Sequence, residues 1–290
     1  MKFSNYLFPC SYLSKIMSNS KEKITDNQVG ELNKLLFKEN PTEKQQKRLE
    51  ELLNKQERNG SVILSSGCKS FLVKVWAKEK YGARYKIRGG KGVPQLVRGV
   101  GSETDAVALL SVVDKKKYYR DKKKISNEFI SGVIDIMDAP TIEQSTRVLD
   151  VKSSFAHINF IAQTTKPELS NNLSMQMKGY LAITKKEIGE VAFCLVDFPE
   201  SIIQEQRSLI FDEMCPDGIP TQQFIKYWEK AEASMRFRYL PPKERVLSYL
   251  VYPDEDFIES TYITIEACRK WLQEFDEQYF EVIARRYMNE

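Results

Sequence analysis

Two charged residues that could do chemistry stand two positions apart in an apolar stretch, RVLDVKSS, at residues 147–154. The valines and the leucine of this stretch are typical of a buried strand, whereas Asp150 and Lys152 are not. Because side chains alternate along a strand, Asp150 and Lys152 lie on one face. For this triplet alone, the simplest interpretation is a buried ion pair or a strand end that reaches solvent.

A third charged residue, Asp135, lies in an equally apolar stretch, GVIDIM. A turn-like segment that contains Pro140 separates the two stretches, so they can pair as strands and bring Asp135 beside Asp150. Two buried carboxylates repel each other and resist desolvation, and a bound divalent cation would relieve both costs. Oxygen ligands favour Mg²⁺, with Mn²⁺ as a substitute, and Lys152 would stand beside the metal-bound water.

Strands and helices alternate around these residues. Apolar spacing predicts a helical hairpin over 25–60 and further helices over 66–81, 102–118, 168–187, 200–214, 219–236 and 254–285. Strands are predicted within 127–140, 145–155, 190–199 and 245–253. The fold class is therefore α/β or α+β, with a small mixed sheet flanked by helices.

The sequence predicts that the chain is organised in three regions. Residues 1–24 are expected to be a disordered extension, with Met17 as an alternative start, followed by the hairpin and by one domain over 61–290. Residues 83–100, which are rich in glycine and basic residues, are expected to form an extended or looped segment.

Composition excludes several classes of protein. The 290 residues carry a net charge of +4, 42% are hydrophobic, and no long apolar run predicts a membrane span. The five cysteines are scattered without a CxxC pair, which counts against a zinc ribbon, a disulfide framework and an iron–sulfur cluster. A reducing cytoplasm is the simplest compartment. His157 is the single histidine, so sites that need several histidines are excluded.

Four short motifs follow one another in a recognisable order. They are Glu103 in SETDA, Asp135 in SGVIDIM, the DVK triplet in VLDVKSS, and Gln176 with Tyr180 in QMKGY. Over about residues 60–285 the chain resembles the PD-(D/E)XK nuclease superfamily, in the branch of phage lambda-type and RecB-like exonucleases. The third-motif acid is Asp here, where Glu is more frequent, and no histidine precedes His157, so the first motif is closer to the lambda type.

The resemblance implies a role for each matching residue. Asp135, Asp150 and the backbone carbonyl of Val151 would ligate the metal, and Lys152 would help to activate the attacking water. Glu103 would bind or orient a second metal or its waters. Gln176 would hold the site or the substrate strand, and Tyr180 would pack beneath it or contact DNA.

Basic segments that could hold a polyanion flank the predicted helix of Glu103. One is KIRGGKGVPQLVR and the other is KKKYYRDKKK, where tyrosines interleave with cations. The residues expected to contact DNA are Arg88, Lys91, Arg98, Lys122 and Lys123, together with Ser66 and Lys69 at a helix start that could take a 5′-phosphate. The alternative for the basic segments is a solvated run of charges without a ligand. The alternative for the helix start is a serine that only caps the helix.

The resemblance implies an Mg²⁺-dependent exonuclease that hydrolyses linear double-stranded DNA ends, in phage-type recombination, replication or repair. A single-strand annealing or recombinase protein would be its partner, relatives of the lambda type form rings, and a phage-encoded protein would act in the host cytoplasm. The sequence leaves open an endonuclease with the same site, a non-catalytic DNA-binding protein of the same fold, and a globular protein whose motifs coincide by chance.

Overall fold

This computed structural model describes residues 3–82 and 94–288, and within 94–101 and 282–288 it describes the backbone alone. The chain forms two compact units, each built from segments that are distant in sequence. Unit 1 comprises residues 1–8, 12–86 and 259–290, and unit 2 comprises residues 9–11 and 87–258. This division differs from the expected boundary at residue 61. None of the described helices combines the length and the apolar character needed to span a bilayer.

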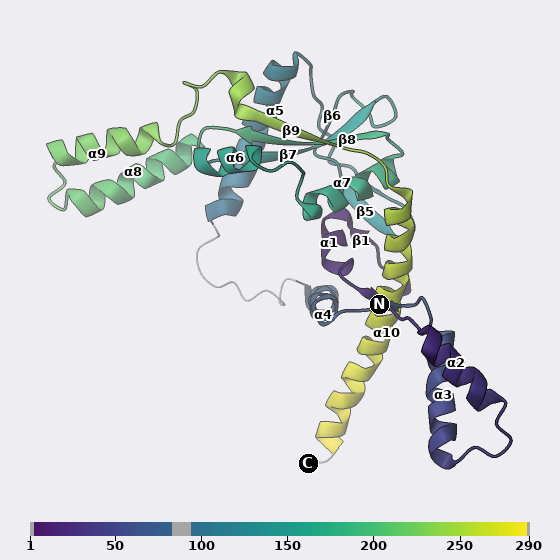
Figure 1. Cartoon of the computed structure of the whole chain (residues 1–290). Helices are drawn as coiled ribbons and strands as arrows, with labels where there is room; N and C mark the ends of the chain where they lie inside the picture. Colours follow the sequence, from purple (N-terminus) through teal and green to yellow (C-terminus); the bar gives the residue numbers. More distant parts are fainter. Residues whose placement is uncertain (1–2, 83–93, 289–290) are drawn as a thin grey trace. The chain divides into compact units, whose positions relative to one another are not determined.

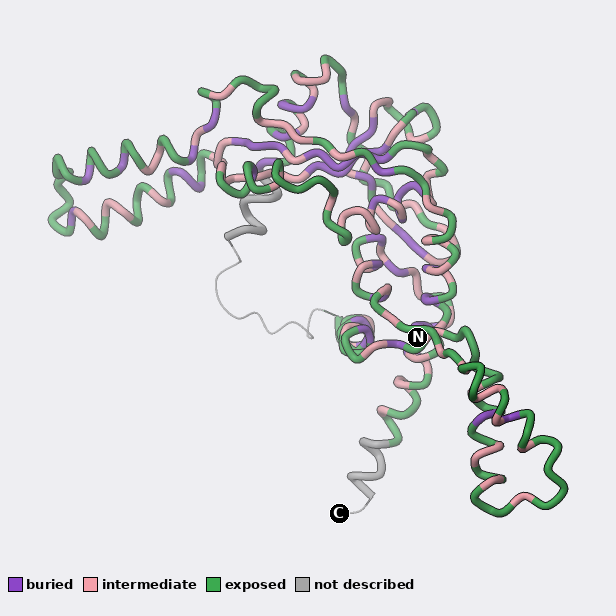
Figure 2. Tube along the Cα trace, viewed as in Figure 1, coloured by how far each residue is buried: buried purple, intermediate pink, exposed green. Residues whose placement is uncertain are grey.

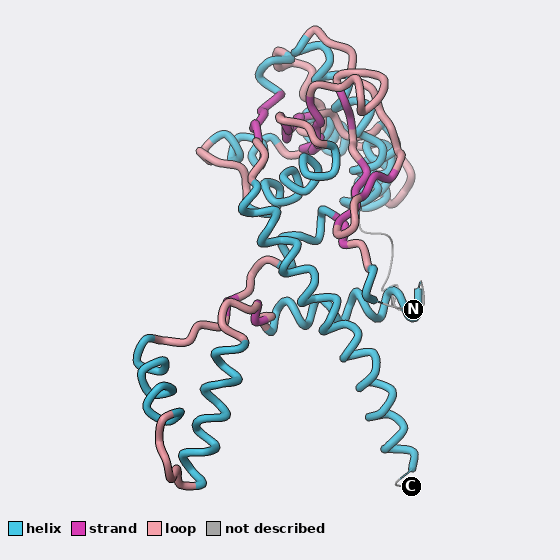
Figure 3. Tube along the Cα trace, turned by 90° about the vertical axis from the view of Figure 1, so that its right-hand side faces the viewer, coloured by secondary structure: helices cyan, strands magenta, loops and turns pink. Residues whose placement is uncertain are grey.

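Unit 1 is mainly helical (Figure 1). Its elements are η1 (Phe3–Asn5), α1 (Leu13–Ile16), β2 (Ser20–Lys21), α2 (Asp26–Leu36), α3 (Glu43–Glu57), β3 (Val62–Ile63), α4 (Ser66–Tyr81) and most of α10 (Glu255–Met288). The residues of β1 (Phe8–Pro9) and η2 (Cys10–Tyr12) are divided between the two units. The predicted hairpin corresponds to α2 and α3, which lie side by side (Figure 3). Each begins with a capping box, formed by Thr25 with Gln28 and by Thr42 with Gln45.

From Phe3 onward the N-terminal segment forms short elements with buried side chains, in place of the disordered extension expected over 1–24. Phe3, Leu13 and Ile16 are fully buried. On α10 the guanidinium of Arg269 donates two hydrogen bonds to the carbonyl of Tyr6, at 3.1 and 3.0 Å. The apolar residues of this segment therefore gain more from packing than a solvated tail would.

Unit 2 contains the mixed sheet. Its elements are α5 (Pro94–Asp114), β4 (Lys124–Ser126), β5 (Ile130–Val133), β6 (Ile136–Met137), β7 (Arg147–Ser154), α6 (His157–Thr164), α7 (Asn171–Thr184), β8 (Ile188–Leu195), α8 (Glu200–Met214), α9 (Gln222–Ala233), η4 (Pro242–Arg245) and β9 (Val246–Val251). The sheet order is β6-β7-β8-β9; β7 and β8 are parallel and the other pairs are antiparallel. A hairpin of β4 and β5 accompanies it.

The two faces of the sheet are covered by different helices. Ala106, Leu109 and Leu110 of α5 pack against Leu149 and Val151 on one face. On the other face α7 lies so close to β8 that a Cβ on Gly189 would approach Met177 to 2.5 Å. The central strands are accordingly the most buried part of unit 2 (Figure 2), and their alternation gives each face its own chemistry.

Helix α5 begins earlier than predicted. The sequence indicated a loop over 83–100 and a helix from 102, whereas α5 starts at Pro94. Proline suits the first turn of a helix because its fixed φ is already helical and its missing N–H has no partner there. The remainder of the expected loop, 83–93, lies outside the described residues. Helix α6 was not predicted; it is short and exposes Ile158 and Ile161, which weakens its periodic signal.

Candidate active site

The pairing of β6 with β7 brings the two predicted carboxylates together. Ile136 pairs with Leu149 in this antiparallel ladder. If that register is continued by one residue, Asp135 lies opposite Asp150. Asp135 itself occupies a bend between β5 and β6, not a ladder position. Its carboxylate oxygen Oδ2 accepts a hydrogen bond from the backbone N–H of Val151, at 3.3 Å, which fixes it beside β7.

Asp150 and Lys152 form the ion pair that the triplet alone suggests. The Lys152 ammonium lies 2.9 Å from Oδ1 and 2.7 Å from Oδ2 of Asp150, with hydrogen-bond geometry at Oδ1. Asp150 is only 2% exposed. Its Oδ2 is buried and accepts no hydrogen bond from the described residues. The ammonium of Lys152 lies close to both oxygens of Asp150, so it already compensates the charge of this one carboxylate.

The second carboxyl makes the site electrostatically unbalanced. Burial, hydrogen bonding with Asp150 and repulsion by the charge of Asp150 together raise the pKa of Asp135 to about 7. The Lys152 ammonium and the backbone N–H of Val151 oppose this shift. One lysine thus faces two acids, so the site has an excess of negative charge once both carboxyls are ionised.

Helix α7 supplies the support beneath these acids. The Gln176 amide Nε2 donates to the Tyr180 hydroxyl at 3.0 Å, one turn along the helix. Tyr180 is 7% exposed, and burial followed by the charge of Asp150 raises the pKa of its hydroxyl. Its ring occupies the space above Gly132 of β5, where an added Cβ would come within 2.5 Å of Cε1. The buried position favours the packing role expected for Tyr180 over direct contact with DNA.

Glu103 lies on α5, where its side chain is 48% exposed and forms an ion pair with Arg120. Among the described residues, no group of three or more His, Cys, Asp or Glu side chains converges on one point. The acids that the structure brings together are therefore Asp135 and Asp150. The role of Glu103 in binding a second metal, and that of the Val151 carbonyl, stay predictions.

The residues expected to hold DNA lie in several places. Lys122 and Lys123 are exposed in the segment before β4 of unit 2. Ser66 and Lys69 lie in the first turn of α4 in unit 1, where the cap is made by Ser65, whose hydroxyl accepts from the Cys68 N–H at 3.1 Å. Arg88 and Lys91, together with the side chain of Arg98, lie outside the described residues.

Two residues that shape the site were not singled out in the sequence. Gly132 was one; a glycine inside a strand pattern is the signal that marks a close approach. Asp138 was the other, and it anchors the turn between β6 and β7. It accepts from the Ser145 hydroxyl at 2.7 Å and from the Thr146 N–H at 2.9 Å. Burial would raise the pKa of Asp138, but these hydrogen bonds outweigh it and hold that pKa at about 2.

The described residues fit a divalent cation. Asp135 and Asp150 offer hard oxygen donors of the kind that Mg²⁺ and Mn²⁺ prefer. Lys152 compensates one of the two carboxylates, and the repulsion between them is relieved by further positive charge.

Comparison with solved structures shows which known proteins share the fold of this chain. The structure of a phage related exonuclease from Haemophilus somnus 129PT superposes with a TM-score of 0.58, at 14% sequence identity, over 95% of this chain and 97% of that chain. The chain has the fold of that exonuclease. An alkaline exonuclease from Laribacter hongkongensis, LHK-Exo, superposes less closely, with a TM-score of 0.49 at 10% identity over 96% of this chain and 98% of that one. No family model and no curated protein matches the sequence.

This shared fold confirms the predicted α/β class with a small mixed sheet, and at the level of the fold it agrees with the resemblance to exonucleases.

Proposed function

We propose that this chain is an Mg²⁺-dependent DNA exonuclease that hydrolyses phosphodiester bonds at linear double-stranded ends. The observation that carries the proposal is the cluster of the buried Asp150 with the half-buried Asp135 and Lys152, in a chain that has the fold of an exonuclease. Mn²⁺ would substitute for Mg²⁺, because both accept oxygen ligands in similar geometry.

Each residue of the cluster has a separate task in this proposal. Asp135 and Asp150 would hold the ion, which when bound supplies charge stabilisation to the phosphoryl oxygens and a more acidic water. Lys152, already beside Asp150, would orient the attacking water and stabilise charge on the phosphate. Tyr180 and Gln176 would keep α7 in register beneath the two acids.

DNA would be held by the basic residues outside the cluster. Lys122 and Lys123 are exposed and belong to a run of cations at residues 115–124 in which Lys117 lies over the ring of Tyr119, 5.1 Å from its centroid. Such a combination of cations and aromatic rings suits a nucleic-acid backbone and its bases. We further propose Ser66 and Lys69 as contacts for a 5′-phosphate, and phage-type recombination, replication or repair as the process served.

The test is digestion of three DNA substrates by the full-length protein. They are a linear duplex with 5′-phosphates, the same duplex with 5′-hydroxyls, and a closed circle, each with Mg²⁺, with Mn²⁺ and with EDTA. We expect the linear duplexes to be degraded only with metal and the circle to survive. Cutting of the circle would indicate an endonuclease, and digestion in EDTA would reject the metal mechanism.

Matched variants separate the site from the fold. Asp150→Asn keeps the size of the side chain and should abolish digestion and also the rise in melting temperature that Mg²⁺ gives the wild-type protein. Asp217→Asn, in the exposed turn between α8 and α9, should change neither. If Mg²⁺ stabilises the protein but no DNA is degraded, the chain is a metal-binding protein without nuclease activity.

A further inference from the structure

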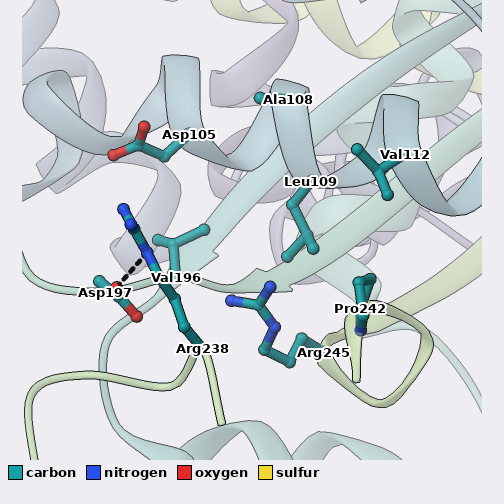
Figure 4. Close-up of a pocket in the computed structure, with 9 residues that line it drawn as sticks. All are labelled: Asp105, Ala108, Leu109, Val112, Val196, Asp197, Arg238, Pro242 and Arg245. Carbon is teal, nitrogen blue, oxygen red and sulfur yellow. Dashed lines mark ion pairs between the residues drawn. The ribbon is translucent and has the colours of Figure 1, made fainter. Parts of the chain in front are cut away.

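A cavity of about 230 Å³ lies in unit 2 between α5, the end of β8 and η4 (Figure 4). Helix α5, which forms one wall of the cavity, packs on the face of the sheet from which Leu149 and Val151 project. Asp150 and Lys152 alternate with those residues along β7, so they point to the opposite face. The cavity is therefore separate from the candidate active site.

The lining combines an apolar wall with two arginines. Leu109 and Val196 are buried and form the floor, and the more exposed Val112 continues the wall along α5. Opposite them, the guanidinium groups of Arg238 and Arg245 reach across the opening (Figure 4). The cavity thus offers apolar contact on one side and planar hydrogen-bond donors on the other.

The two arginines differ in how far their charge is compensated. Arg238 Nε lies 2.9 Å from Oδ2 of Asp197, and Oδ1 of the same carboxylate accepts from the Phe237 N–H at 2.6 Å. Arg245 makes no ion pair with the described residues, and its Nε is buried without a hydrogen-bond partner there. A buried donor without an acceptor is unfavourable, and an anion in the cavity would satisfy it.

Charge and size restrict which anion fits. Asp105 and Asp197 also line the cavity, so a polyanion or a phosphate dianion would be repelled, whereas a single negative charge is balanced by Arg245. At about 230 Å³ the cavity is smaller than the roughly 300–1,000 Å³ of pockets that hold drug-sized ligands. Its volume suits one apolar side chain with a carboxylate beside it.

We propose that this cavity binds the C-terminal residue of a partner protein. The apolar side chain of that residue packs on Leu109 and Val196, and its terminal carboxylate pairs with the guanidinium of Arg245. Binding of a terminal carboxylate is a common mode of peptide recognition, since it needs few contacts and distinguishes a C-terminus from internal residues.

The test uses a fluorescein-labelled peptide that ends in leucine with a free carboxylate, and the same peptide with a C-terminal amide. Fluorescence anisotropy with the full-length protein should show binding of the acid at least about tenfold tighter than binding of the amide. Arg245→Gln should lower the affinity for the acid by at least about tenfold, and Arg245→Lys, which keeps the charge without the planar fork, by less. Lys243→Gln, on the same η4 but outside the cavity lining, should leave it unchanged.

Each other outcome overturns the proposal. Equal binding of acid and amide, or full binding by Arg245→Gln, would show that the guanidinium does not hold the carboxylate. Displacement of the peptide by inorganic phosphate more readily than by acetate would show a general phosphate site instead. Digestion of linear DNA by Arg245→Gln should match that of the wild-type protein, so the result stands apart from the proposed nuclease activity.

Discussion

At the scale of single residues, the site is defined by an imbalance of charge. The half-buried Asp135 and the buried Asp150 lie together, and among the described residues the one cation that pairs with them is Lys152, which lies 2.7 Å from Oδ2 of Asp150. A structural ion pair needs one acid and one base, and the additional acid raises the free energy of the folded state when it ionises. A bound cation would remove this cost, so the second acid is consistent with a metal site.

The raised pKa of Asp135 predicts how stability changes with pH in the absence of metal. The folded-state pKa of about 7 lies above the unfolded value of about 3.9. The stability that comes from the neutral carboxyl is therefore fully present below about pH 3.9 and is lost as the pH rises through about 7. Asp135→Asn removes this titration, so in EDTA its free energy of unfolding, relative to the wild-type value, should rise between pH 5 and pH 8. Urea unfolding of both proteins at pH 5 and pH 8 measures these free energies. If the difference between variant and wild type is the same at both pH values, the raised pKa of Asp135 is contradicted.

Lys152 can be separated from the metal ligands by its effect on rate. Lys152→Gln should lower the rate of DNA digestion by about 10²- to 10⁴-fold, the range typical of a lost proton-transfer or charge-stabilising group. The Mg²⁺-induced rise in melting temperature should persist, because both carboxylates remain. Lys226→Gln, an exposed lysine on α9, provides the control and should keep the full rate. Loss of the Mg²⁺ effect in Lys152→Gln would show a structural role instead.

At the scale of elements, the predictability of the site follows the length of each element. Strand β7 has 8 residues and helix α7 has 14, so both elements, and with them the positions of Lys152 and Gln176, could be predicted from the sequence. Strand β6 has two residues, and Asp135 lies in the bend before it, so only tertiary pairing fixes its place. The start of α5 at Pro94 was hidden by the glycine-rich sequence around it.

The contact between β5 and α7 can be tested at Gly132. An alanine Cβ there would lie 2.5 Å from Cε1 of Tyr180, so the ring or the helix must move. We expect Gly132→Ala to destabilise the fold by about 1–3 kcal/mol through overpacking and to slow DNA digestion, because Tyr180 supports the acids. Chemical denaturation and digestion rates measure the two effects.

Gly30→Ala is the comparison for that substitution. Gly30 lies inside α2, and a Cβ there would meet no atom within 4 Å. It should stabilise the protein by about 0.5–1 kcal/mol, since alanine is the better helix former, and leave digestion unchanged. If Gly132→Ala behaved in the same way, the close packing of Tyr180 would have no bearing on the site.

At the scale of the whole molecule, the sequence could not reveal how the chain is divided. Residues 1–8 and 259–290 belong to the same unit although they stand at opposite ends of the chain, and such long-range association leaves no periodic signal. The N-terminal segment was expected to be disordered because polar residues and a proline interrupt its apolar residues, yet Phe3 and Phe8 are buried. Local patterns predict helices and strands, whereas the partner of each apolar face is set by the fold.

Net charge gives a poor guide to DNA binding in this chain, because +4 spread over 290 residues is a weak bias. Local density matters more, since each cation that contacts a phosphate releases a counterion. Lys122→Gln combined with Lys123→Gln should therefore weaken binding to duplex DNA and reduce the slope of log affinity against log salt by about 2. Fluorescence anisotropy in EDTA, where cleavage is not expected, measures both quantities.

A charge-matched pair of substitutions decides whether location or total charge is responsible. Lys226→Gln combined with Lys230→Gln removes the same two charges from the exposed surface of α9, where acids are as frequent as bases. If DNA follows the basic run at 115–124, this second variant keeps the salt slope of the wild-type protein. If both variants lose affinity equally, the attraction is a property of net charge alone, and the DNA path must be sought elsewhere on the molecule.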